Sequence, residues 1–187
     1  MDQRTIVLIG AIVLVLAIAA AAWVWLRRRR TDLLRRRFGP EYQRAVETTG
    51  DVRKAEADLE ARQRRVAKFP IRPLSPADQT RYLESWREIQ TRFVDDPKEA
   101  VAEADRVVKE VLQARGYPMS DFEQRVADIS VDHPAVVSNY RAAREIARRS
   151  ASGEASTEEL RQSLVYYRAL FEDLLETAEP FRKEARR

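Results

Sequence analysis

The sequence contains no cysteine and only one histidine, and these two shortages exclude most active-site chemistry. Without cysteine there is no disulfide, no thiol nucleophile and no thiol for lipid attachment. One histidine supplies too few nitrogen ligands for the usual zinc sites. Glycine is also scarce, with 5 residues among 187. This scarcity, together with abundant alanine, leucine, glutamate and arginine, predicts an all-helical chain.

Positive charge is confined to one short part of the chain. The formal net charge is +4, but setting aside Asp2, Arg4 and Arg27–Arg30 leaves 29 basic and 29 acidic side chains in residues 31–187. The excess lies in a segment that we call the collar, Arg27–Arg30 and Arg35–Arg37. Interleaved charges elsewhere cancel the long-range field that nucleic-acid binding uses, so nucleic acid is disfavoured as a partner.

Residues 6–26 form the only long uncharged run, and they predict a single transmembrane helix. At about 1.5 Å per residue the run is about 31 Å long, which matches the hydrocarbon core of a bilayer. Trp23 and Trp25 stand at its charged end, where indole rings prefer the headgroup layer. A cleaved signal peptide is the alternative, with the alanines of residues 17–22 as the cleavage site. The length of the run and the arginines behind it favour a retained anchor.

The collar also predicts the orientation of the anchor. Arginines concentrate on the cytoplasmic side of membrane helices, so residues 1–5 are expected outside and the C-terminal part in the cytoplasm, at the inner (plasma) membrane. The predicted membrane-surface residues are Trp23, Trp25, Arg27, Arg28, Arg29, Arg30, Arg35, Arg36 and Arg37.

Behind the anchor we expect a basic collar and helical connector over residues 27–70, a helical bundle over 71–179 and a basic tail over 180–187. Leu33, Leu34 and Phe38 are expected on an apolar edge. The connector helix of residues 52–69 carries apolar side chains at near-heptad spacing, interrupted by Arg62. It either packs one narrow stripe against the bundle or forms a dimeric coiled coil, and the interruption favours the first interpretation.

Helix starts within the bundle are marked by capping residues. Ser75 precedes Pro76, Asp96 precedes Pro97, and Ser156 stands three residues before Glu159. We also expect a helix over residues 120–129, and another from Pro134 to Arg149 that is capped by Asp132. The short link at Asp95–Asp96 predicts an antiparallel hairpin.

Apolar side chains at helical spacing define the expected core faces. They are Tyr82, Trp86, Ile89 and Phe93 in one helix, Val101, Ala104, Val108, Val111 and Leu112 in the next, Phe122, Val126 and Ile129, then Val136 or Val137 with Tyr140, Ala143 and Ala147, and finally Leu160, Leu164, Tyr167, Phe171, Leu174 and Ala178.

Three groups of residues invite a functional interpretation, and each has a simpler structural one. Asp128, Asp132 and His133 could bind a metal, but a site needs three or more converging ligands, only one histidine exists to contribute, and Asp132 is better explained as a cap. Adjacent Asp95 and Asp96 could act as a carboxylate pair, although their place before Pro97 is typical of a helix cap. We therefore predict no catalytic residue, no metal site and no cofactor.

Two further patterns concern binding. Tyr82, Trp86 and Phe93 could stack on bases, but their helical spacing favours the core. Ala17 and Ala21 form one small-xxx-small pair in the anchor, which permits a homodimer through the transmembrane helix. The connector offers the other route to a homodimer.

Four motifs carry a resemblance to a known group of proteins. They are RFGPEY at residues 37–42, RFVDDP at 92–97, DFEQR at 121–125 and DISVDHP at 128–134. With them the chain resembles an uncharacterised family of small helical, often membrane-anchored proteins of high-GC bacteria. The family has no assigned activity, so the resemblance implies no site residues.

These observations predict a non-enzymatic interaction or scaffold protein that presents a cytoplasmic helical bundle at the inner membrane face. Its expected partners are membrane lipids and an unknown protein. The alternative is an electrostatic binder of anionic lipid or nucleic acid that works through the collar, and a carboxylate-based enzyme is the third possibility.

Overall fold

The computed structural model describes the backbone of residues 3–176 and the side chains from residue 14 onward, except those of residues 15 and 176. This part of the chain is all α-helical and contains no strand, as the composition predicts. The helices are α1 (Gln3–Phe38), α2 (Pro40–Thr49), α3 (Val52–Val66), α4 (Pro76–Asp95), α5 (Pro97–Ala114), α6 (Phe122–Asp132), α7 (Val137–Ala151) and α8 (Thr157–Glu176).

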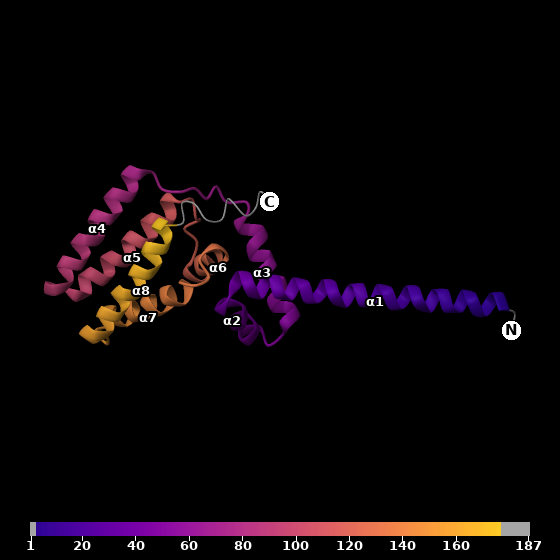
Figure 1. Cartoon of the computed structure of the whole chain (residues 1–187). Helices are drawn as coiled ribbons and strands as arrows, with labels where there is room; N and C mark the ends of the chain where they lie inside the picture. Colours follow the sequence, from indigo (N-terminus) through magenta and orange to yellow (C-terminus); the bar gives the residue numbers. More distant parts are fainter. Residues whose placement is uncertain (1–2, 177–187) are drawn as a thin grey trace.

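Helix α1 projects from the rest of the molecule, and only its C-terminal end contacts other helices (Figure 1). Within the described part of the chain, no helix has a stretch both long and apolar enough to cross a membrane. The predicted span over residues 6–26 includes side chains, 6–13 and 15, that lie outside the described part, and the transmembrane helix stays a prediction. The predicted tail, residues 180–187, and Ala178 also lie outside it.

The end of α1 forms one small core with α2 and α3. Its buried side chains are Leu34, Phe38, Tyr42, Ala45, Ala55, Leu59, Val66 and, from α6, Val131. Gly39 allows the sharp change of direction between α1 and α2, since its φ of 48° lies in the left-handed region that favours glycine. The prediction that Leu33 lies on the apolar edge is wrong, because Leu33 is 60% exposed.

Helix α3 packs against α2 and α6 of its own chain, as the first interpretation of the connector predicts. Ala55, Leu59 and Val66 are buried in these contacts, so the near-heptad stripe is covered within the chain. Arg62, which interrupts the stripe, turns toward Glu41 instead of toward an apolar partner. Val52, the first position of the stripe, is exposed and does not join the core.

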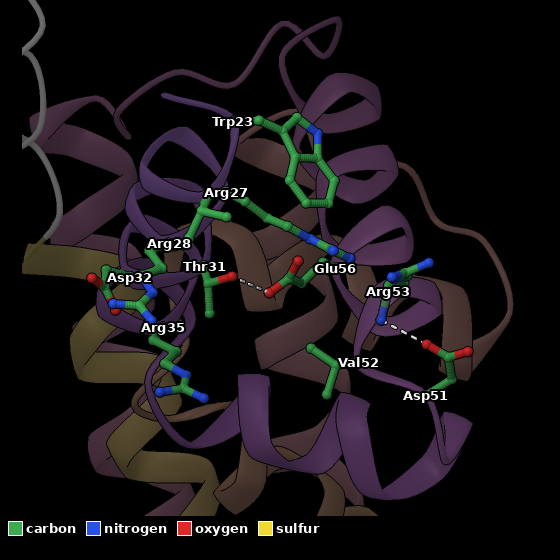
Figure 2. Close-up of a pocket in the computed structure, with 11 residues that line it drawn as sticks. Trp23, Arg27, Arg28, Thr31, Asp32, Arg35, Asp51, Val52, Arg53 and Glu56 are labelled. Atoms are coloured by element: carbon green, nitrogen blue, oxygen red, sulfur yellow. Dashed lines mark hydrogen bonds between the residues drawn. The ribbon is translucent and has the colours of Figure 1, made fainter. Parts of the chain in front are cut away.

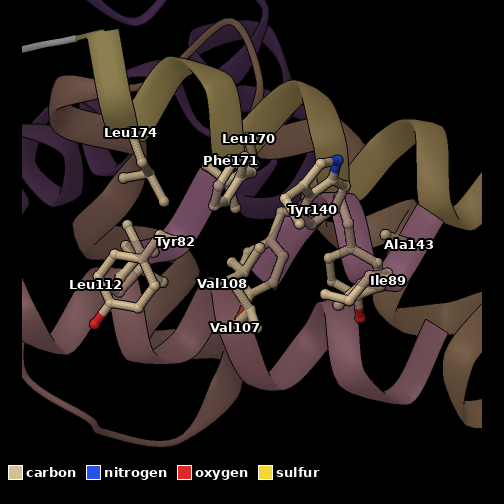
Figure 3. Packing of buried hydrophobic residues seen from close by; sticks show 14 of the residues in the cluster. Tyr82, Ile89, Val107, Val108, Leu112, Tyr140, Ala143, Leu170, Phe171 and Leu174 are labelled. Carbon is tan, nitrogen blue, oxygen red and sulfur yellow. The ribbon is translucent and has the colours of Figure 1, made fainter. Parts of the chain in front are cut away.

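The larger core lies among α4, α5, α7 and α8 (Figure 3). Helices α4 and α5 form the expected hairpin, and α8 packs on α5 and α7. The ring of Trp86 stacks on that of Phe171, with centroids 4.6 Å apart. Tyr82, Trp86 and Ile89 are buried as predicted, whereas Phe93 is only half-buried.

Three of the predicted helix caps are confirmed. The Ser75 side chain accepts a hydrogen bond from the backbone N–H of Asp78, and Asp96 accepts one from Glu99, both at 3.1 Å. At the start of α8, the N–H of Ser156 donates to the Glu159 carboxylate, and the N–H of Glu159 donates back to Ser156 Oγ. These bonds satisfy donors that a helix leaves unpaired at its first turn.

The prediction for the segment around residue 133 is wrong. Helix α6 starts at Phe122, with Asp121 as its cap, and continues to Asp132, three residues further than expected. Helix α7 then starts at Val137, not at Pro134, and has no side-chain cap. The extension of α6 buries Val131 in the small core, and this burial outweighs the cap that Asp132 would have supplied.

Gly116 fixes how the loop before α4 lies on the end of α5. Its φ is 95°, and a Cβ atom at this position would lie 2.5 Å from the carbonyl oxygen of Pro70. The N–H of Arg72 donates to the carbonyl of Arg115 at 2.9 Å in the same place. The close approach of two backbone segments therefore requires glycine here.

Because Trp86 is 5% exposed and stacks on Phe171, we expect Trp86→Ala to lower the free energy of unfolding by about 3–5 kcal/mol. Chemical denaturation of the full chain in detergent, followed by far-ultraviolet circular dichroism, measures the change. The neighbouring exposed Arg87→Ala is the matched control, expected within about 0.5 kcal/mol of the parent. A loss below about 1 kcal/mol for Trp86→Ala would contradict its place in the core.

Candidate functional site

An open hollow lies between α1 and the start of α3 (Figure 2). We call it the collar groove; it is open on one side and has a volume of about 620 Å³. It is lined by Trp23, Val24, Arg27, Arg28, Thr31, Asp32, Arg35, Asp51, Val52, Arg53 and Glu56. Arginine, tryptophan and valine side chains share one wall, which is a suitable arrangement for a ligand with a phosphate and an apolar part.

The predicted membrane-surface arginines divide into two sets. Arg30 pairs with Glu60 of α3, Arg37 lies 3.9 Å from the Asp132 carboxylate, and the Arg35 guanidinium lies over the ring of Tyr42, 5.3 Å from its centroid. These three side chains attach α1 to α2, α3 and α6. These exposed arginines therefore make contacts within the chain, which the sequence alone does not reveal.

The second set remains at the surface of α1. The Cζ atoms of Arg27 and Arg29 lie 5.2 and 5.4 Å from the ring centroids of Trp23 and Trp25, respectively. Both tryptophans are about 60% exposed. Arg28 and Arg36 are exposed as well. These four collar arginines, of which Arg27 is half-buried and the other three are exposed, lie on the same helix as the two indole rings and offer their charges to an external anion.

Glu41 of α2 is an enclosed carboxylate between the small core and the bundle, with 4% of its side chain exposed. Both terminal nitrogens of Arg141, in α7, donate to it at 2.7 Å. Arg62 of α3 donates to the same carboxylate at 3.2 Å. Two arginines on one buried carboxylate satisfy its lone pairs and tie α2, α3 and α7 together.

The candidate metal ligands are engaged in ion pairs and hydrogen bonds instead. Asp128, with 2% of its side chain exposed, lies 2.7 Å from the Arg65 guanidinium. Asp132 accepts a hydrogen bond from the Tyr117 hydroxyl at 2.9 Å. His133 directs Nδ1 toward Asp173 of α8. Within the described residues no group of three or more histidine or carboxylate side chains could hold a metal ion.

His133 is not at the start of α7 but is the C-terminal cap residue of α6, and its side chain is fully buried. The contact with Asp173 joins the end of α6 to the end of α8. In the same region, Arg115 donates to the carbonyl of Leu174 at 2.7 Å. The single histidine therefore has a structural environment between three helix ends.

The other candidate residues are also accounted for by the fold. Asp95 is the exposed last residue of α4, and Asp96 caps α5. Tyr82 and Trp86 belong to the core face of α4, so they are not a platform on which bases could stack.

Burial and nearby carboxylates raise the pKa of three tyrosines. Desolvation raises the pKa of Tyr140 to about 12. Desolvation and the neighbouring Asp105 carboxylate raise the pKa of Tyr167, and desolvation with Asp132 does the same for Tyr117. These hydroxyls stay protonated at neutral pH and do not act as general bases. Those of Tyr117 and Tyr167 donate hydrogen bonds to Asp132 and Asp105, respectively.

A second open hollow, the distal groove, lies between the start of α5 and the end of α7. Its volume is about 600 Å³. Small and charged residues line it, namely Asp96, Lys98, Glu99, Val101, Ala102, Ala147, Ser150, Ala151, Ser152 and Gly153. Such a shallow surface, lined by small residues, can accept the side chains of a partner protein.

No family model, no curated protein and no solved structure matches this chain. The resemblance of the four motifs to a family of membrane-anchored helical proteins is therefore not tested by these comparisons.

We expect Glu41→Gln to lower the free energy of unfolding by about 3 kcal/mol, because it leaves the largely buried Arg141 without its counter-charge and leaves Arg62 with Asp58 alone. Urea denaturation of the full chain in detergent measures the effect. Glu47→Gln, an exposed change on the same helix, is the control and should stay within about 0.5 kcal/mol. Equal losses for the two variants would show that Glu41 does not hold the helices together.

Hydrogen bonds from the Ser156 backbone and side chain, and the Arg149 guanidinium, lower the pKa of Glu159 from 4.5 to about 2. A lowered pKa stabilises the fold above the unfolded value, and that stabilisation is lost as the pH falls through the folded one. The difference in unfolding free energy between the parent and Glu159→Gln should therefore be full above pH 4.5 and vanish near pH 2. Denaturation curves across this range test it, and a difference that does not depend on pH would contradict it.

Proposed function

We propose that the protein is a membrane-tethered, non-enzymatic interaction protein. The observation that carries the proposal is the unpartnered apolar surface of α1. Leu14, Leu16, Ile18, Val24 and Leu26 are between 41% and 64% exposed, and no other described helix covers them. Contiguous apolar surface of this kind needs a cover, and a lipid bilayer fits the uncharged run over residues 6–26.

The arrangement of charge supports the proposed orientation. The two indole rings lie on α1 at the end of the apolar stretch, and Arg27, Arg28 and Arg29 follow before the buried Leu34. Arginines retained on the cytoplasmic side would place the bundle in the cytoplasm, at the inner membrane face, with residues 1–5 outside.

The state of the polar side chains favours binding over catalysis. The enclosed carboxylates of Glu41, Asp105 and Asp128 are each engaged by arginine. A tethered bundle raises the effective concentration of its surface for partners in the same membrane plane, so even a shallow site suffices. The distal groove is our candidate for contact with a partner protein, because small and charged side chains line an open hollow there.

The second candidate function is binding of anionic lipid through the collar. It is favoured by the four arginines that remain at the surface of α1, although Arg30, Arg35 and Arg37 are engaged elsewhere. Nucleic acid is a weaker candidate, because the remainder of the surface alternates in sign.

The natural absence of cysteine makes the membrane topology directly measurable. In cells, a cysteine introduced as Val94→Cys, on the exposed end of α4, should react with membrane-impermeant maleimide only after lysis. The protein should also stay in the membrane fraction through alkaline carbonate extraction, since about 21 apolar residues anchor it. Labelling of intact cells, or release by carbonate, would contradict the proposed topology or the anchor, respectively.

Contact with a partner is tested by crosslinking in cells, followed by mass spectrometry. Ala102→Arg places a large side chain at an exposed position of the distal groove. It should abolish a specific crosslink to the partner. Gln90→Arg, an exposed change on α4, is the matched control and should retain it. Identical crosslinks for both variants would exclude the distal groove.

A separate variant tests the alternative that the protein is an enzyme. Asp95→Asn removes an exposed carboxylate that caps no helix, so the variant should stay folded and keep the phenotype of the parent. Loss of function in folded Asp95→Asn would favour an enzyme over an interaction protein.

A further inference from the structure

The turn between α2 and α3 brings an exposed apolar side chain next to the exposed part of α1. Val52 is 46% exposed, and it lines the collar groove together with Trp23 and Val24. In Figure 1 the first turn of α3 is the part of the folded body that reaches furthest toward the N-terminal half of α1. Two separate elements therefore present apolar side chains at one opening.

The position of this opening along α1 corresponds to the headgroup layer, a step that rests on the proposed membrane anchor. The polar layer on each side of a bilayer is about 5–8 Å thick. Trp23 and Arg27 are about 6 Å apart along the helix axis. With the predicted span ending at Leu26, both side chains lie at headgroup depth, whereas Arg35 lies beyond it on the cytoplasmic side.

Positive charge enters the groove from both helices. The Arg27 side chain crosses from α1 beneath Trp23 toward α3, where Arg53 extends from the opposite wall (Figure 2). Arg53 is exposed, and its backbone N–H is held by the Asp51 cap at 2.7 Å, which fixes the residue at the rim. Two guanidinium groups facing one opening offer several N–H donors to the oxygens of a phosphate.

The acidic residues of the groove do not cancel this pair. Asp51 is occupied as the cap of α3, and Glu56 accepts hydrogen bonds from the hydroxyls of Thr31, at 2.7 Å, and Tyr42, at 3.0 Å. Asp32 lies beside Arg28 in Figure 2, on the side of the groove away from Arg53. These bonds leave the carboxylates charged, but the arginines of the lining outnumber the acidic residues by one, so the net charge of the groove is positive.

We infer that the α2–α3 turn is a second membrane contact and that the collar groove binds the phosphate of an anionic phospholipid headgroup. Arg27 and Arg53 hold the phosphate, while Trp23 and Val52 lie against the glycerol and the upper acyl chain. The apolar rim distinguishes a lipid from free phosphate, which would gain nothing from Val52.

The first test locates Val52 relative to the lipid. The full chain carrying Val52→Cys, labelled with an environment-sensitive fluorophore, is placed in nanodiscs of phosphatidylglycerol and phosphatidylcholine in equal parts. Headgroup-spin-labelled lipid should quench this fluorophore several-fold more than one at Val94→Cys, which is 82% exposed on α4. Equal quenching at the two positions would overturn the second membrane contact.

The second test measures lipid selectivity. The preference of the full chain for spin-labelled phosphatidylglycerol over phosphatidylcholine should fall about fivefold or more in the Arg27→Gln, Arg53→Gln variant, given the weight of one cation near an anionic surface. The Arg87→Gln, Arg148→Gln variant removes the same charge from exposed positions of the bundle and should keep the preference of the parent. Unchanged selectivity in the first variant would overturn the site.

The outcomes separate this inference from the proposed function. A chain that fails to insert into the nanodiscs overturns the anchor, and the headgroup site with it. A chain that inserts but shows no quenching difference and no loss of selectivity overturns the site alone. If millimolar inorganic phosphate displaces phosphatidylglycerol, the groove is a site for free phosphate, and the proposal that it binds a lipid is overturned.

Discussion

The arrangement of the helices depends on the ion pairs that the Glu41 carboxylate forms. Bound by Arg141 of α7 and Arg62 of α3, it joins the small core around the end of α1 to the bundle. A buried charge is costly unless every lone pair is used, and here two guanidinium groups use them. The arrangement sets the direction in which α1 leaves the body. The collar groove depends on it too, because α2 packs on both α1 and α3, the helices that form the walls of the groove.

Local signals in the sequence predicted most of the helices and the core of the bundle. Ser75, Asp96 and Ser156 cap helices because a short polar side chain before proline or glutamate satisfies the first-turn N–H groups, whatever the rest of the chain does. Trp86 and Tyr82 are buried because a continuous apolar face at helical spacing has nowhere else to go.

The errors and omissions arise where distant segments meet. In the sequence, Arg62 interrupts an apolar stripe without an evident reason. The structure supplies the reason, because Arg62 donates to Glu41, 21 residues earlier. Asp132 has the sequence context of a helix cap, but burial of Val131 prolongs α6. The Asp132 carboxylate instead accepts a hydrogen bond from the Tyr117 hydroxyl. No local pattern in the sequence marks Arg53 as a candidate binding residue, since its place in the proposed site depends on α1 lying beside the α2–α3 turn. No pattern within a single helix contains such information.

The unbroken course of α1 has a mechanical consequence. Residues 26–38 contain neither glycine nor proline, and Leu34 and Phe38 are buried in the folded body, so the helix and the body turn as one lever. The arm from Leu26 to Phe38 is about 18 Å long, and a tilt of about 20°, common for membrane helices, moves its end by about 6 Å. With the proposed anchor in a bilayer, any change in its tilt would thereby change the angle at which the bundle meets a neighbouring protein.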